Sequence, residues 1–240
     1  MKVYKLFLIT MLSALTALTS CSKEDGMNTS QKNVNVTFAT QLPQANPLAK
    51  SVTEQFPDIE GYHIRYILEV WTAGANPELY KRIVKSAEAD KTASFDVNLL
   101  SGRTFDFLLW ADYVKDGAND DMHYNTSKGL TSVERSEKAF VTDERTDYSL
   151  AVTRDAFFAY KQITADASVT ENLTLKRAVA QLNIFTTDYD LVEDNFKPAY
   201  AAVSLTTTAV FNVLTQNSFG AINSDCKSYV AIKTAKEGTS

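Results

Sequence analysis

The chain has 240 residues, a formal net charge of -5, and a composition that is 45% hydrophobic and 22% charged. These values are typical of a globular protein, so they exclude a disordered tail and a bundle of membrane helices. The negative charge, without a basic cluster, argues against a nucleic-acid partner, whose phosphates require a positive surface.

Residues 1–21 have the pattern of an export signal. Lysines precede an apolar run that is too short to span a bilayer as a permanent helix. The run ends in the pattern of a bacterial lipobox, formed by Leu18, Thr19, Ser20 and Cys21. We expect cleavage before Cys21 and acylation of its thiol, which would hold the protein at a membrane through lipid. The alternative is an ordinary secretory signal.

Residues 22–32 are polar and aperiodic, which predicts a flexible tether. From Asn33 onward, apolar and polar residues alternate in segments that predict half-buried strands. The first five predicted strands are 33–38, 62–71, 79–87, 93–99 and 105–113. The last of these is apolar on both faces through Leu108 and Trp110, so we expect a central strand covered on two sides. Arg65 is expected on the solvent face of 62–71.

The second half of the chain has a weaker pattern. Further strands are predicted around 139–141, 148–152, 173–175, 178–184, 203–205 and 210–214. The alternation changes phase near Lys176 and Arg177, which predicts a β-bulge there. Residues 155–160 are predicted to form one helical turn capped by Asp155.

Many short strands with almost no helix predict an all-β sandwich or barrel. A polar stretch near 188 marks a domain boundary. We therefore expect an N-terminal β-sandwich domain over 33–187 and a partial second β domain over 188–240. With Cys21 lipidated, Cys226 has no intrachain partner, so no disulfide framework is expected.

Enzymatic motifs are missing from the sequence. Neither His63 nor His123 belongs to a metalloprotease motif, and both are expected at the surface or rim. Asp106 and Asp112 lie about 20 Å apart along one strand face at about 3.3 Å per residue. Glycosidase carboxylates are separated by about 5 to 9.5 Å, so this is no catalytic pair. We expect no enzyme, no cofactor and no metal.

Two side-chain groups admit a binding interpretation. Trp71 and Trp110 are candidate ligand-stacking aromatics, with burial beneath a second layer as the alternative. The acidic run 119–121 offers oxygen ligands for calcium but lacks the spacing of an EF-hand, which favours a solvated loop.

Four motifs, in order, carry a resemblance to a known family. They are 108–113 (LLWADY), 155–158 (DAFF), 175–180 (LKRAVA) and 211–215 (FNVLT). Together with the lipobox, the chain resembles the fimbrillin-like proteins of Bacteroidales. The resemblance implies transthyretin-like β-sandwich domains in an outer-membrane, surface-exposed lipoprotein that forms or anchors a fimbria. Its partners would be other fimbrial subunits, joined by strand addition.

In shaft subunits of that family, cleavage after a basic residue, usually arginine, removes the first strand. Lys50 is the candidate processing site here, since Arg65 lies inside an apolar strand. A chain that is not cleaved would stay at the membrane as an anchor. The alternative function is a surface lipoprotein that binds a host glycan or protein and forms no polymer.

Overall fold

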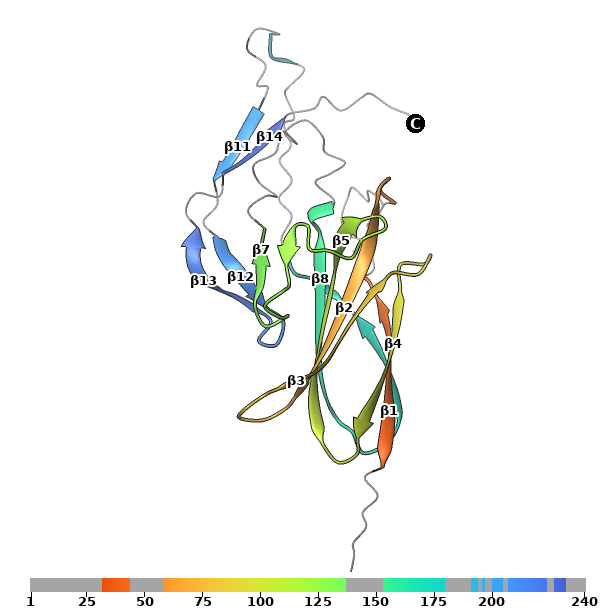
Figure 1. The fold of residues 1–240 in the computed structure, drawn as a ribbon. Coiled ribbons are helices and arrows are strands. Elements are labelled where there is room, and N and C mark those ends of the chain that lie inside the picture. The colour runs from red at the N-terminus through yellow and green to blue at the C-terminus, as the bar shows by residue number, and fades with distance from the viewer. Residues whose placement is uncertain are drawn as a thin grey trace, which may run out of the picture. The chain divides into compact units, whose positions relative to one another are not determined.

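The described part of the chain is built from β-strands (Figure 1). A computed structural model describes residues 32–43, 58–136, 153–179, 191–193, 196, 200–204, 207–223 and 227–231. The strands are β1 (Asn33–Gln41), β2 (Tyr62–Thr72), β3 (Leu79–Ser86), β4 (Ala93–Leu100), β5 (Thr104–Lys115), β6 (Tyr124–Asn125), β7 (Val133–Arg135), β8 (Ala156–Thr164), β9 (Val169–Thr174), β10 (Lys176–Arg177), β11 (Tyr200–Ser204), β12 (Thr207–Asn212), β13 (Asn217–Asn223) and β14 (Lys227–Ala231). Within these ranges no helix is long and apolar enough to cross a membrane.

Two sheets pack face to face as a β-sandwich, which confirms the all-β prediction. One has the strand order β4-β1-β9 and the other the order β10-β8-β5-β2-β3. In the first sheet, β1 pairs antiparallel with β4 and parallel with β9. In the second sheet, β5 lies between β2 and β8, as Figure 1 shows. The transthyretin-like assignment stays a prediction.

The main core lies between these sheets and follows directly from the alternation in the sequence. Every second residue of β1 is buried, beginning with Val34 and Val36. The odd-numbered residues of β5 meet them from the opposite sheet. Phe38 and Phe107 make the closest ring contact described between the two sheets, with centroids 4.6 Å apart. We call the face of the five-stranded sheet that lines this core its inner face.

The opposite, outer face of the five-stranded sheet carries a second, smaller core. Leu108 and Trp110 of β5 are buried there beside Ile67 of β2. The Trp110 ring lies 5.2 Å from that of Tyr124 and 6.2 Å from that of Phe211, measured between centroids. The prediction that β5 is covered on both faces is therefore confirmed.

The cover of the outer face comes from segments far apart in the sequence. A sheet of order β13-β12-β7-β6 contributes to it, and so does the loop between β6 and β7. Phe211 of β12 pairs with Val133 of β7, and the backbone N–H of Val213 donates to the carbonyl of Leu130 at 3.0 Å. The predicted domain boundary at 187/188 lies outside the described residues, but strands from both sides of it share this sheet.

The predicted bulge at Lys176 and Arg177 is wrong. The chain leaves the three-stranded sheet after Thr174 and enters the five-stranded sheet at Lys176. Leu175 is buried at the crossing, where its N–H donates to the carbonyl of Gln41 at 2.9 Å. The phase change in the sequence therefore marks a switch between sheets, because the two sheets present their core faces in opposite directions.

The helical turn predicted over 155–160 is also wrong, because residues 156–160 open β8, which lies between β10 and β5 in the five-stranded sheet. Asp155 pairs with Arg177 at 2.9 Å instead of capping a helix. The aromatic pair Phe157 and Phe158 fits a strand because its two rings enter the two different cores. The strands predicted at 139–141 and 148–152 lie outside the described residues.

Candidate functional site

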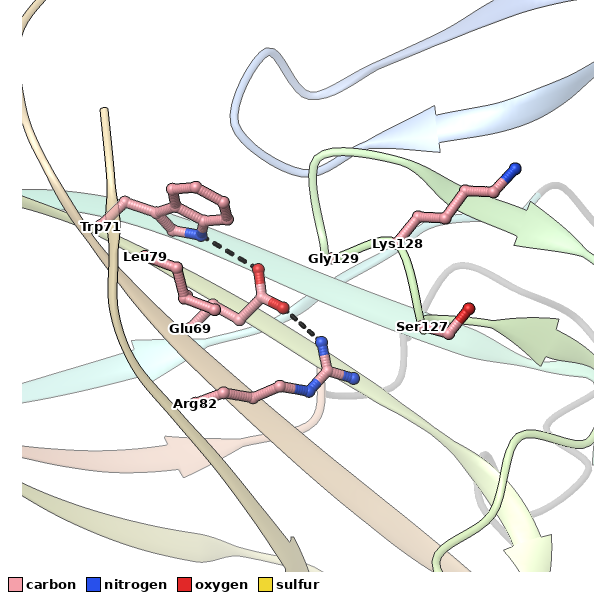
Figure 2. A pocket seen from close by; sticks show the side chains of 7 residues that line it. All are labelled: Glu69, Trp71, Leu79, Arg82, Ser127, Lys128 and Gly129. Carbon is pink, nitrogen blue, oxygen red and sulfur yellow. Dashed lines mark hydrogen bonds and ion pairs between the residues drawn. The ribbon is translucent and has the colours of Figure 1, made fainter. Parts of the chain in front are cut away.

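A pocket of about 260 Å³ opens on the outer face, between β2, β3 and the loop that follows β6 (Figure 2). Its lining combines apolar, charged and small side chains: Glu69, Trp71, Leu79, Arg82, Ser127, Lys128 and Gly129. Strand β2 supplies Glu69 and Trp71, and β3 supplies Leu79 and Arg82. The register of the two strands places Trp71 opposite Leu79 and Glu69 opposite Arg82. The loop supplies the remaining three.

The buried carboxylate of Glu69 organises the pocket floor. Its Oε2 accepts hydrogen bonds from the Trp71 indole at 3.0 Å and from the Leu130 backbone N–H at 2.9 Å. Its Oε1 accepts from the Arg82 guanidinium. A buried carboxylate without partners would be strongly destabilising, so these donors and the opposite charge are what permit its burial. Figure 2 shows the indole and the guanidinium on either side of this carboxylate.

The loop wall of the pocket is held in place from several directions. Arg82 Nη2 donates to Thr126 Oγ1 at 2.7 Å, which ties β3 to the loop. Thr126 in turn donates to the Asp121 carboxylate through its backbone N–H at 2.8 Å and its hydroxyl at 2.9 Å. Gly129 has a φ of +92°, and a Cβ there would lie 3.5 Å from Glu69 Oε2 and 3.7 Å from Trp71 Cζ2. The glycine therefore brings the loop backbone close over the pocket floor.

A second charged cluster lies further along the same face, around Arg65. Its guanidinium donates to both oxygens of Asp112, at 2.9 and 2.8 Å, and to Asp121 Oδ1 at 2.9 Å. It also donates to the carbonyl of Asn119 at 2.7 Å. Burial raises the pKa of Asp112, and the charge of Arg65 opposes that rise. The prediction that Arg65 faces solvent is wrong because the loop carrying Asp121 covers this part of the sheet.

Several predicted residues lie apart from one another. Asp106 accepts hydrogen bonds from Tyr160 and Gln162, both at 2.8 Å, whereas Asp112 belongs to the Arg65 cluster. The two carboxylates thus have separate partners. The acidic run 119–121 is not merely a solvated loop, because Asp121 is tied to Arg65 and Thr126.

The two tryptophans have different environments. Trp110 is 1% exposed within the second core, so it offers no surface for ligand stacking, and the alternative of burial holds for it. Trp71 is partly buried and lines the pocket. Of the histidines, His63 is at the rim, 3.3 Å from Asp116. His123 is buried and bonds to Thr153 at 2.8 Å, which contradicts its predicted surface position.

The residues that matter most at the pocket were not identified from the sequence. Glu69 stands among apolar residues in the middle of a strand, and an acid at such a position predicts a buried ion pair. The sequence therefore carries a signal for burial of Glu69, although Glu69 is not among the residues predicted above. Arg82, Lys128 and Gly129 carry no comparable signal, because their proximity to Glu69 depends on strand pairing and on the path of the loop.

Other predicted residues lie outside the described part of the chain: Leu18, Thr19, Ser20, Cys21 and Lys50. Among the described residues, no group of three or more His, Cys, Asp or Glu side chains is arranged to hold a metal ion. The carboxylates of Glu69, Asp112 and Asp121 instead meet arginines, and Asp106 accepts from Tyr160 and Gln162.

One protein-family model matches residues 28–240, and its description reads "Family of unknown function (DUF6562)". No curated protein and no solved structure matches the chain.

Proposed function

We propose that this chain, which belongs to the DUF6562 family of unknown function, is a fimbrillin-like outer-membrane surface lipoprotein that assembles by β-strand addition. It serves as a structural subunit or an anchor of a fimbria, and it acts through binding surfaces without catalysis. The observation that carries the proposal is the place of β1 in the sandwich and in the sequence.

β1 is the central strand of the three-stranded sheet, is buried on one face, and comes from the N-terminal end of the domain. It bonds to β4 on one side and to β9 on the other, and its residues Val36 and Phe38 are fully buried. Removing it would leave a groove with two unpaired strand edges and an exposed apolar floor. An extended segment from another subunit, with the same alternation of apolar residues, could fill such a groove.

The position of β1 between two predicted processing points gives the chain two possible roles in one fibre. The predicted lipidated residue Cys21 precedes β1, and the candidate cleavage site Lys50 follows it. Cleavage after Lys50 would separate lipid and β1 from the remaining sandwich, which would become a polymerising subunit. A chain that is not cleaved would keep both and hold a fibre at the membrane.

At one side of the sandwich, the sheet edge formed by β4 is protected against pairing with strands of other chains. This supports assembly through the groove of β1 and not through that edge. Side chains of β3 reach across to carbonyls of the neighbouring sheet edge, β4. The Tyr80 hydroxyl donates to the Asn98 carbonyl at 3.2 Å, and Lys85 Nζ donates to the Ser94 carbonyl at 2.6 Å. Side-chain capping and lysines are established devices for keeping exposed edges from joining other chains.

The polymer role is tested by the electrophoretic behaviour of the native protein. We expect a ladder of SDS-resistant species in unheated membrane samples and a single band after boiling. Lys50→Gln should abolish the ladder, whereas Lys81→Gln, which removes the same charge from strand β3, should leave it intact. A single monomer band from unheated wild-type membranes would refute polymerisation, and a ladder unchanged by Lys50→Gln would refute processing at that site.

The anchor role is tested at the predicted lipidation site. Cys21→Ala should release the protein, with any attached fibre, from the membrane fraction into the medium. Mass spectrometry of the wild-type N-terminus should find an acylated cysteine. Retention of Cys21→Ala in the membrane fraction, or an unmodified thiol in the wild type, would contradict the role.

A further inference from the structure

The buried face of β1 carries one polar side chain in an otherwise apolar row. Alternate residues of the strand are buried in the sandwich, and they are Val34, Val36, Phe38 and Thr40. Thr40 is 1% exposed, so it is as deeply buried as the apolar residues that precede it. A hydroxyl group at such a position is costly to bury unless it finds hydrogen-bond partners inside the protein.

The Thr40 hydroxyl bonds to both backbone polar groups of one residue on the neighbouring strand, β4. It donates to the carbonyl oxygen of Ala93 at 2.8 Å and accepts from the N–H of Ala93 at 3.2 Å. A hydroxyl suits this place because a single oxygen atom both donates and accepts. Valine has nearly the same shape as threonine, but it would remove this partner from both groups of the buried Ala93.

This corner of the sandwich is polar, whereas the rest of the surface beneath β1 is apolar. The Tyr66 hydroxyl, from the five-stranded sheet, donates to the carbonyl of Lys91 at 2.7 Å and lies within hydrogen-bonding reach of Thr40. Two residues earlier in β1, Phe38 packs its ring on Phe107. A groove left by β1 would therefore have an apolar length and one polar end.

The polar end distinguishes registers that the apolar alternation cannot distinguish. A strand shifted by one residue turns its apolar side chains away from the core, but a strand shifted by two residues keeps them inside. In the observed register, Phe38 lies opposite Phe95 and Thr40 lies opposite Ala93. A shift of two residues would move the hydroxyl away from Ala93 and the aromatic ring away from Phe107, so only one register satisfies both contacts.

We propose that the groove left by β1 selects an extended segment of another subunit whose successive buried positions hold two aliphatic residues, an aromatic residue and a serine or threonine. The segment runs antiparallel to β4 and parallel to β9, as β1 does. Its hydroxyl bonds to the backbone of Ala93 and thereby fixes the register of the incoming strand. This inference rests on the proposed function, because the groove opens only when β1 is displaced, and it adds the chemistry of the partner segment.

The test uses the full chain with a site for a specific protease inserted after Lys50, and both fragments are kept after cleavage. The cut protein is unfolded in urea and refolded with an excess of two competing synthetic peptides. One has the sequence of residues 33–41, and the other carries Thr40→Val. Native mass spectrometry measures how much of each peptide occupies the sandwich. We expect the wild-type peptide to be enriched at least about tenfold, the ratio that corresponds to about 1.4 kcal/mol.

Two further peptides separate the buried hydroxyl from other changes. Thr40→Ser keeps the hydroxyl and should bind within about threefold of the wild-type peptide. Thr37→Val removes a hydroxyl from the opposite face of the same strand, where it donates to Asp96 at 2.6 Å in an exposed position. Water can replace that bond, so this control should also bind within about threefold of the wild type.

The outcomes distinguish this inference from strand addition itself. Equal occupancy by the wild-type and Thr40→Val peptides would overturn the role of the hydroxyl and leave strand addition intact. Equal weakening by Thr40→Val and Thr37→Val, or by Thr40→Val and Thr40→Ser, would overturn it as well. A refolded sandwich that retains only its own N-terminal fragment, and none of the peptides, would contradict both this inference and strand addition.

Discussion

The two faces of the five-stranded sheet are built by different rules. The inner face is apolar along its centre, with residues such as Tyr66, Leu68 and Phe107 packed against the three-stranded sheet. The outer face has a smaller apolar centre, and ion pairs around Arg65 and Glu69 border it. The same strands, β2 and β5, contribute to both faces.

The difference follows from what covers each face. A regular sheet covers the inner face, and its backbone groups bond to neighbouring strands, so apolar packing alone suffices. A loop and two short strands cover part of the outer face, and loop N–H groups need other partners when buried. Glu69 supplies one such partner to Leu130, and Asp121 supplies another to Thr126. Charged side chains therefore hold the cover of the outer face together with its smaller apolar core, whereas apolar contact alone holds the inner face.

The largest expected effect is a cavity in the inner face. Phe107→Ala should lower the free energy of unfolding by about 3 to 5 kcal/mol, because Phe107 is fully buried and its ring packs on Phe38. Phe211→Ala on the outer face should cost less, because Phe211 is only partly buried. Urea denaturation of the two variants measures the comparison, and equal losses would contradict the distinction between the faces.

Breaking the buried ion pair between Arg65 and Asp112 should cause the next largest loss of stability. Arg65→Met leaves Asp112 buried without its main partner and should cost about 3 kcal/mol. The double variant Arg65→Met with Asp112→Leu should recover most of this loss, because it removes the orphaned charge as well. Thermal unfolding of both variants is the measurement. A double variant as unstable as the single one would show that the apolar part of Arg65 matters more than its charge.

Glu69→Gln should affect the outer face selectively. It removes the charge that attracts Arg82 and weakens the bond to the Leu130 N–H, at a cost of about 2 kcal/mol. Hydrogen exchange at the Leu130 amide should accelerate, while exchange in the centre of β5 stays slow. Uniform acceleration across both regions would mean that the loop is not held separately from the inner core.

Alkaline pH should destabilise the fold through buried tyrosines. Burial raises the pKa of Tyr113 to about 12, from 10.0, and also raises that of Tyr66. Above pH 10 the unfolded chain releases these protons while the folded chain retains them, so stability falls as pH rises toward the folded pKa. The loss is about 1.4 kcal/mol per pH unit for each tyrosine. Circular dichroism should show stability unchanged by these groups below pH 10. A phenolate absorbance change near pH 10 in the folded protein that is lost in Tyr113→Phe would refute the burial effect.

The smallest effect concerns two glycines with positive φ. Gly129→Ala and Gly102→Ala should each cost about 1 kcal/mol, because alanine is strained at φ values of +92° and +80°. Their local effects should differ. Gly129→Ala adds a methyl group near Glu69 and Trp71, so it should change acrylamide quenching of Trp71, whereas Gly102→Ala in the β4–β5 turn should not.

Much of the sandwich could be predicted from alternation alone. The predicted strands 62–71 and 105–113 correspond closely to β2 and β5, and both faces of β5 are buried as expected. The errors occurred where one sequence pattern allows two structures. The aromatic stretch after Asp155 fits a helical turn locally, but its pairing with β5 makes it a strand. The phase change near Lys176 fits a bulge, but the chain instead crosses between sheets.

The pocket could be predicted only in part. Trp71 was identifiable as a candidate aromatic, but its neighbours come from another strand and from a loop whose path no periodicity reveals. Polar residues in a segment such as 115–127 predict exposure, yet His123 and Thr126 are buried there. Their burial depends on hydrogen bonds to partners distant in the sequence.

The sequence by itself determined the strands and the main core, because a two-residue repeat of apolar side chains can be buried in only one way by a sandwich. Tertiary structure alone decided which partners the charged residues meet. Arg65 alternates with core residues and resembles a solvent-facing position until a distant loop covers it. Whether a charge on a strand is solvated or buried depends on the partners that the rest of the chain brings to it.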